Sequence, residues 1–234
     1  MIYFKVLLFA FLGFPFCWTT DGFSESPQKI KATAYSDFAN KKVAYFEEHR
    51  AFFGPSGIMR SENDYFDKNR KKIAELVSDY SRNKYMPTYI FRDIRSGHEE
   101  GLKFSDGNYF VFYQNRNSKI EEKIIKPELS TFSCQGWHYF ILENMERLEK
   151  EGVHLNLIFP NKLDEYRFSL KKVAEKGNVI KIRLEFDNWF IKIFAPHLEL
   201  TYDSKTRKIL SFVGPSNIPD EEGNTQNVTV VYES

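Results

Sequence analysis

The chain has 234 residues, with 33 Lys and Arg against 32 Asp and Glu and a formal net charge of +1 at pH 7. This balance argues against a nucleic-acid surface, which needs an excess of cations to replace the counterions of the phosphates. Aromatic residues make up 17% of the chain. Because they favour pleated, half-buried surfaces, they predict sheet structure and a wide core or cavity.

The N-terminal segment has the order of a secretory signal peptide. Lys5 precedes an apolar run from Val6 to Trp18 that only Gly13 and Pro15 interrupt, and polar residues follow it. The run is too short to span a bilayer. We therefore expect residues 1–20 to be removed on export, to the periplasm or otherwise out of the cell, which leaves a mature protein of zero formal charge without an integral membrane span.

The two cysteines predict no internal disulfide. Cys17 lies inside the signal segment and follows Phe14, Pro15 and Phe16, whereas a lipoprotein signal requires small residues at these positions, so lipidation is disfavoured. Cys134 is then the single thiol of the exported chain. We expect it to be a small buried apolar residue rather than a nucleophile, because a reactive thiol requires a nearby base or cation.

Alternating apolar and polar residues predict strands through the N-terminal half. The segment at 73–80 is also compatible with a turn of helix, and the turns between the segments are polar or contain glycine. The predicted strands are Ile30–Tyr35, Lys42–Arg50, Ile73–Tyr80, Tyr89–Ile94, Tyr109–Gln114 and Lys119–Ile125.

One segment follows a helical period. Apolar residues recur at spacings of three and four between Trp137 and Leu148, acidic residues occupy the other side, and Gly152 follows as at a helix C-terminus. This pattern predicts an amphipathic helix over about residues 135–150. It divides the strand-rich chain into two runs.

Strands resume after this helix. The clearest alternation is in Val179–Phe186, where apolar and charged residues take turns, and 198–202 with 208–212 predict a hairpin around a polar loop. Similar patterns occur at 153–159, 166–170 and 228–232. Consecutive strands this close together must be antiparallel.

Together these elements predict a mainly β (α+β) fold. A sheet of about ten strands is large for a flat open layer. We therefore expect residues 29–234 to form a single domain in which one strongly curved antiparallel sheet, or half-barrel, packs on the one amphipathic helix.

Several strings resemble an uncharacterised family of exported bacterial proteins. In the C-terminal half these are Leu198–Arg207 (LELTYDSKTR) and the segments from Ile209 to Tyr232 that contain Gly214, Ser216–Ile218 and Gly223. In the N-terminal half they are Tyr45, Glu47 and His49 in an early strand and Phe91–Gly97 (FRDIRSG). The resemblance covers most of the mature chain.

That family is distantly similar to the lipoprotein-carrier (LolA-like) superfamily. The resemblance implies a periplasmic protein with a strongly curved antiparallel sheet, closed by helices over a hydrophobic cavity that accepts an acyl chain or another apolar ligand. It carries over no catalytic residues.

Motifs for metals and cofactors are absent from the sequence. The five histidines, at 49, 98, 138, 154 and 197, are not paired at metal-ligand spacing, and there is no HExxH motif or cysteine cluster. Neither a phosphate-binding loop nor a G-x-S-x-G nucleophile elbow occurs. We expect no cofactor and no metal.

Four polar residues carry the catalytic alternative. Glu47 and His49 share one face of a predicted strand, and Asp93 and Arg95 share a face of another. If the strands bring them together, they form the acid, base and cation cluster of an envelope hydrolase or transferase. A structural polar network is the favoured interpretation, since buried polar groups on strands usually satisfy each other.

The aromatic and aliphatic residues around the helix carry the binding hypothesis. They are most simply core residues, but pockets for lipids are apolar too, so they also serve as candidate ligand contacts. A third hypothesis is a partner-binding module that uses a sheet edge. The candidate ligand-binding residues are Trp137, Phe140, Ile141, Trp189, Phe190 and Phe194.

Overall fold

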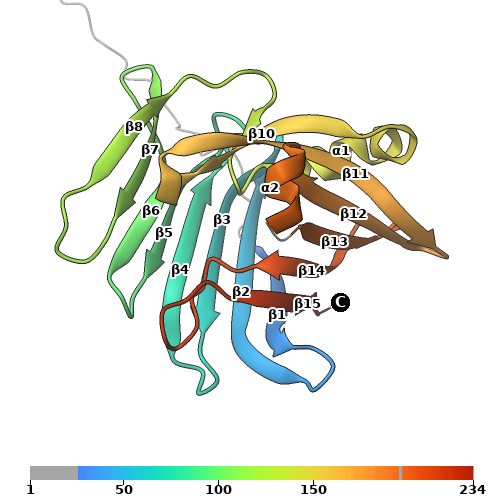
Figure 1. The fold of residues 1–234 in the computed structure, drawn as a ribbon, viewed down its shortest axis with the longest axis horizontal. Helices are drawn as coiled ribbons and strands as arrows, with labels where there is room; N and C mark the ends of the chain where they lie inside the picture. The colour runs from blue at the N-terminus through green and yellow to red at the C-terminus, as the bar shows by residue number, and fades with distance from the viewer. Residues whose placement is uncertain (1–25, 195–196, 234) are drawn as a thin grey trace, which may run out of the picture.

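A single large curled sheet dominates the computed structural model, which describes residues 26–194 and 197–233 (Figure 1). The predicted signal segment lies outside these residues. Within them, fifteen strands join in the order β8-β7-β6-β5-β4-β3-β2-β1-β15-β14-β13-β12-β11-β10-β9. Neighbouring strands are antiparallel except for β9 and β10, which are parallel. The mainly β, curved-sheet prediction is therefore confirmed, and the described sheet does not close.

The first half of the sheet is a meander of eight strands. They are β1 (Gln28–Asp37), β2 (Lys42–Gly54), β3 (Gly57–Phe66), β4 (Lys72–Asp79), β5 (Thr88–Asp93), β6 (His98–Ser105), β7 (Asn108–Gln114) and β8 (Glu121–Ile125).

The second half contains the remaining strands and the helices. They are β9 (Thr131–Phe132), α1 (Trp137–Lys150), β10 (Val153–Phe159), the 3-10 turn η1 (Pro160–Lys162), β11 (Asp164–Lys176), β12 (Val179–Phe186), α2 (Trp189–Phe194), β13 (Leu198–Asp203), β14 (Ile209–Pro215) and β15 (Asn227–Tyr232). β1 and β15 pair along Ala32–Tyr35, so the two ends of the described chain join the two halves into one sheet.

Two apolar clusters form the core. The first lies on the inner face of β1–β8 and also takes in Ile158 from β10. The second lies between the inner face of β10–β14 and α1, where Ile141, Met145 and Leu148 are at most 2% exposed. The helical period of the sequence thus produces the apolar side that α1 buries, as expected for an amphipathic helix packed on a sheet.

The curl of the sheet brings its two ends together. η1 contacts β6 and β7, and Lys123 of β8 forms an ion pair with Asp164 of β11 at 3.0 Å. The start of α1 approaches the backbone after β4 closely, because a Cβ atom at Gly136 would lie 1.9 Å from the Tyr85 carbonyl oxygen. Only glycine fits at position 136, because any side chain would collide with the Tyr85 backbone. The close contact lies directly before the first residue of α1.

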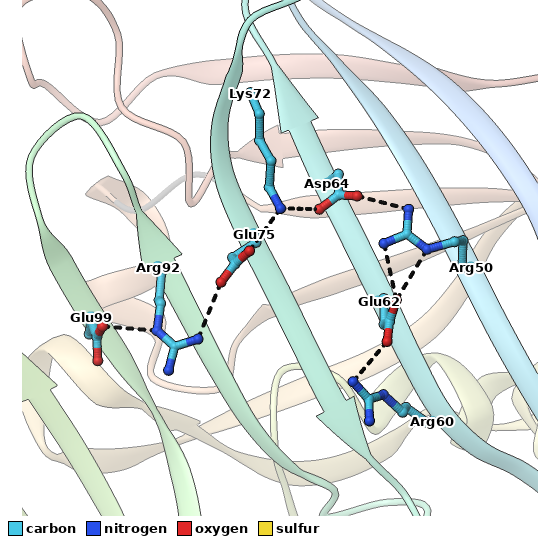
Figure 2. A network of polar contacts seen from close by, with 8 residues as sticks. All are labelled: Arg50, Arg60, Glu62, Asp64, Lys72, Glu75, Arg92 and Glu99. Carbon is cyan, nitrogen blue, oxygen red and sulfur yellow. Dashed lines mark hydrogen bonds and ion pairs between the residues drawn. The ribbon is translucent and has the colours of Figure 1, made fainter.

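The outer face of β2–β6 carries a ladder of alternating charges (Figure 2). Arg50 bridges Glu62 at 3.1 Å and Asp64 at 2.8 Å, and Lys72 continues the ladder from Asp64, at 2.7 Å, to Glu75. The pairs of Arg50 with Glu62 and Asp64 and of Lys72 with Asp64 join adjacent strands, where opposite charges stabilise a sheet, whereas Lys72 and Glu75 both lie on β4. The outer surface of this half is therefore solvated and saturated with ion pairs.

Some elements differ from the predictions. The strand assignment at 73–80 is confirmed by β4, whereas β3, β6, β9 and α2 were not predicted. On β3 the inward positions include Ser61 and Asn63, and on β6 they include His98 and Glu100, which pair with the buried Asp93 and Phe91. Apolar alternation is therefore interrupted, although the backbone continues as a strand.

No helix in the described part of the chain combines the length and the apolar character that crossing a membrane requires.

Candidate ligand-binding cleft

A cleft of about 790 Å³ opens between α1 and the inner face of the sheet. Its walls come from β1, β2 and β3, from the segment after β4, from α1 and from the hairpin of β13 and β14. Small-molecule sites in proteins have volumes of about 300–1,000 Å³. Elements from both ends of the chain form this site, because the pairing of β1 with β15 places them side by side.

A smaller hollow of about 220 Å³, called the inner end of the cleft below, adjoins it on the inner face of the sheet. Ile30, Tyr80, His138, Tyr139 and Tyr232 line both spaces. The inner end is reached by side chains of β2, β3 and β13 and by the start of α1. A ligand in the cleft would thus lie against both core clusters.

Aromatic rings connect α1 to the sheet at this site. The rings of Tyr80 and Tyr139 meet edge to face at 5.1 Å, and the Tyr80 hydroxyl donates to the carbonyl oxygen of Gln135 at 3.3 Å. Burial raises the pKa of both tyrosines. Their hydroxyls therefore stay protonated at neutral pH and present neutral walls to the cleft.

His138 faces the cleft from the first turn of α1. Its Nδ1 lies 2.8 Å from the Tyr202 hydroxyl, and the two rings are stacked. Burial, with a smaller effect of nearby His49, lowers the pKa of His138 to about 4. The Tyr202 hydroxyl therefore donates a hydrogen bond to Nδ1 of the neutral His138, and the Tyr202 side chain is completely buried.

Glu47 and His49 do form a pair at the inner end of the cleft. His49 Nε2 lies 2.6 Å from the Glu47 carboxylate, and the Glu47 side chain is 7% exposed. The His49 ring lies 5.9 Å from that of Tyr232 on the wall of the cleft. This pair is held within the sheet by its own contacts, as in a buried polar network.

Asp93 and Arg95 form a second pair at another place. Arg95 Nη2 lies 2.6 Å from Asp93 and also donates to the Pro219 carbonyl oxygen at 3.3 Å. Burial acts to raise the pKa of the Asp93 carboxyl, but the hydrogen bonds and charge of Arg95 outweigh it and lower that pKa. The pair joins the end of β5 to the loop before β15.

The two pairs do not converge in one catalytic cluster. Glu47 and Asp93 occupy one cross-strand row, through Tyr65 and Ala74, three strands apart. At a spacing of about 4.8 Å per strand they are separated by about 14 Å. His49 lines the inner end of the cleft, whereas Arg95 lines a separate hollow among polar loops.

The candidate ligand-binding residues divide into three groups. Trp137 lines the inner end of the cleft. Ile141 is 0% exposed in the core under α1, and Phe140 packs on that core with its ring 4.9 Å from Phe132. These two residues pack in the core under α1 and do not line the cleft.

The residues of α2 lie elsewhere. The expectation that Trp189 and Phe190 are core residues is wrong, because they are 72% and 58% exposed. Lys192 of α2 forms an ion pair with Glu185 on the outward side of β12, which explains why these rings point away from the core. The side chain of Phe194 lies outside the described part.

The mouth of the cleft is cationic. Five cations line it, against the two carboxylates Glu143 and Glu233; the cations are Lys29, Arg82, Lys84, Arg207 and Lys208. Lys84 is bound to Glu143 at 2.6 Å. The sequence contains no local signal for this surface, because the five cations come from three separate segments.

Cys134 is half-buried and lines the inner end of the cleft. Its Sγ donates to the Ile158 carbonyl oxygen at 3.2 Å, and burial raises the pKa of the thiol to about 12. A raised pKa is what an unreactive thiol has, but the side chain is half-buried and not fully buried as predicted. Among the described residues, no group of three or more His, Cys, Asp or Glu side chains is arranged to hold a metal ion.

No protein-family model and no curated protein matches this sequence. A solved structure does resemble it: a β-barrel-like protein of the domain of unknown function DUF1849 from Brucella abortus. The TM-score is 0.50 with 8% sequence identity, and the alignment covers 89% of this chain and 97% of that chain. At this identity the similarity concerns the fold alone.

Proposed function

We propose that this protein is a non-enzymatic binding protein that holds an apolar ligand of the cell envelope in the cleft beside α1. The observation that carries the proposal is the cleft itself, with its volume of about 790 Å³. Its interior walls include Phe53, Ile58, Met59, Leu142 and Ile209, and sites for small molecules are lined mainly by such side chains.

Export to the periplasm is part of the proposal. It rests on the order of residues 1–20, in which a lysine precedes a short apolar run. The resemblance to exported bacterial proteins and, distantly, to lipoprotein carriers agrees with a curled antiparallel sheet. Cell fractionation and the N-terminal mass of the recovered protein test this part separately from ligand binding.

A substitution that fills the cleft tests the binding function. Ala51 points inward from β2 and lines both the cleft and its inner end. Ala51→Trp places an indole in this space, and we expect it to abolish binding of the neutral apolar dye N-phenyl-1-naphthylamine. Thr33→Trp adds the same side chain to the outer face of β1, where residues alternate with buried Ala32 and Ala34.

The outcomes separate clearly. Dye binding by the parent and by Thr33→Trp, with loss in Ala51→Trp, supports the proposal. Equal binding by all three proteins would show that the dye does not occupy the cleft. Thermal unfolding of each variant checks that loss of binding does not reflect loss of the fold.

The pair at the inner end of the cleft favours a second candidate, an envelope hydrolase or transferase. His49 and Glu47 are 2.6 Å apart and His49 reaches the cleft, as a general base and its orienting carboxylate require. A screen with acyl and glycosyl ester substrates, comparing the parent with His49→Gln, tests it. Turnover that disappears in His49→Gln would replace the binding proposal.

A further inference from the structure

The cations that line the cleft differ from those of the charge ladder on the outer face of β2–β6. On the outer face of β2–β6 the arginines and lysines bind carboxylates (Figure 2). Among the described residues, Lys29, Arg82 and Lys208 have no carboxylate within ion-pair distance. Arg82 instead lies 3.7 Å above the ring of Phe104. Three of the positive charges that line the cleft therefore lack a carboxylate partner.

This charge is local. The whole chain has a formal net charge of +1, while the lining of the cleft carries five cations and two carboxylates. One of these carboxylates, Glu143, is already bound by Lys84 and by the Tyr85 hydroxyl, each at 2.6 Å. The hollow beside Arg95 shows the opposite balance, with three cations and four carboxylates. The positive field thus belongs to the cleft and not to the surface in general.

The three cations without a carboxylate come from separate elements that all line the cleft. Lys29 lies on β1, Arg82 follows β4, and Lys208 precedes β14. Their long side chains can bring the charges to solvent while the stems cover apolar surface. Deeper in the cleft the lining becomes aliphatic and aromatic, with Ile30, Ile209 and Tyr139. The site therefore has an apolar interior and a positive rim.

We infer that the ligand is an anionic amphiphile, with an acyl chain in the cleft and a carboxylate or phosphate at the rim formed by Lys29, Arg82 and Lys208. This inference rests on the proposed binding function and specifies its ligand class. Charge complementarity supports it, because an anion supplies the partner that these cations lack. Exposed ion pairs of this kind change affinity by about 2- to 5-fold each and are weakened by salt.

The test compares three ligands that share one acyl chain. Oleate supplies a carboxylate, oleoyl lysophosphatidic acid supplies a phosphate, and monoolein is neutral. Binding is measured below the critical micelle concentration from the fluorescence of Trp137, which lines the inner end of the cleft. Isothermal titration calorimetry provides an independent affinity. Each titration is run in 50 mM and in 500 mM NaCl.

Two triple variants with the same loss of charge are compared with the parent. The rim variant carries Lys29→Gln, Arg82→Gln and Lys208→Gln. The control carries glutamine at three exposed lysines that have no ion pair among the described residues and lie outside the described hollows. These lysines are Lys119, Lys126 and Lys176.

We expect the parent and the control to bind at least one anionic ligand about tenfold more tightly than monoolein at low salt. The rim variant should lose about tenfold for that anion and keep its affinity for monoolein. A preference for oleate identifies a carboxylate headgroup, and a preference for lysophosphatidic acid identifies a phosphate. In either case 500 mM NaCl should reduce the preference.

Equal affinity for the three ligands, or an unchanged rim variant, would overturn the inference and leave the binding function in place. Binding of none of them by the folded parent would overturn the inference together with the proposed function for acyl ligands. An equal loss in the control variant would attribute the effect to net charge and would also overturn the rim assignment.

Discussion

The neutral His138 at the start of α1 makes the stability of the fold depend on pH. Burial is the main reason that its pKa in the folded chain is about 4, whereas the ordinary value is 6.5. Between these values the unfolded chain binds more protons than the folded chain. The free energy of unfolding therefore decreases as the pH falls from 6.5 towards 4, and the contribution of His138 is fully present only above pH 6.5.

The size of the effect follows from this interval. At 1.36 kcal/mol per pH unit, the difference between the two pKa values limits the contribution of His138 to the free energy of unfolding to about 3 kcal/mol. The ring is partly exposed to the cleft, and solvent screening lowers the figure. We expect the titration of His138 to lower the free energy of unfolding by about 2 kcal/mol between pH 7 and pH 4.5.

Urea unfolding of the parent and of His138→Gln at pH 7, 6, 5 and 4.5 measures this contribution. Glutamine does not titrate, so the stability of the variant depends on pH only through the carboxylates, the other histidines and the remaining titrating groups. These include His98, whose raised pKa stabilises the fold below pH 6.5 and acts in both proteins. The difference between the curves should shrink by about 2 kcal/mol as the pH falls. A difference that stays constant from pH 7 to pH 4.5 would refute the reasoning.

Three further predictions concern the fold. Ile141→Ala leaves a cavity under α1 at a side chain that is 0% exposed, and should cost about 2–5 kcal/mol in urea unfolding; a cost below about 1 kcal/mol would mean that α1 does not pack as described. Arg50→Met removes contacts to Glu62 and Asp64 at the surface, and should cost about 1 kcal/mol at low salt. In 1 M NaCl this cost should largely disappear, and a salt-independent loss would contradict the ion-pair explanation. The thiol of Cys134, with its pKa of about 12, should resist thiol-reactive dyes at pH 8 until urea unfolds the chain, and rapid labelling of the native protein would contradict the raised pKa.

The sequence predicts those strands whose inward side chains are apolar. β12 alternates Ile180, Ile182 and Leu184 with charges, and all three are at most 1% exposed. The inner face of the first half-sheet is more polar: Ser61 and Asn63 point inward on β3. A pattern that scores apolar residues alone therefore misses β3, although its backbone pairs along most of its length with both neighbours.

The cleft depends on contacts that no local pattern encodes. The period of α1 identifies a helix, but it does not show that Ile141 faces the core while His138 and Tyr139 line the cleft. Lys29 and Lys208 become neighbours at the mouth only because the first strand pairs with the last strand of the sheet. Glu47 and His49 were predicted correctly as neighbours, since residues two apart share one face of a strand.

Native mass spectrometry tests the central claim, that the cleft holds an apolar ligand, most directly. The full chain is expressed with its N-terminal segment, recovered from the periplasmic fraction, and weighed before and after mild delipidation. We predict a mass excess over the polypeptide that disappears on delipidation, and that is absent from Ala51→Trp but present in Thr33→Trp. A bare polypeptide mass in the parent before delipidation, with no mass gained on adding oleate or monoolein, would contradict the account.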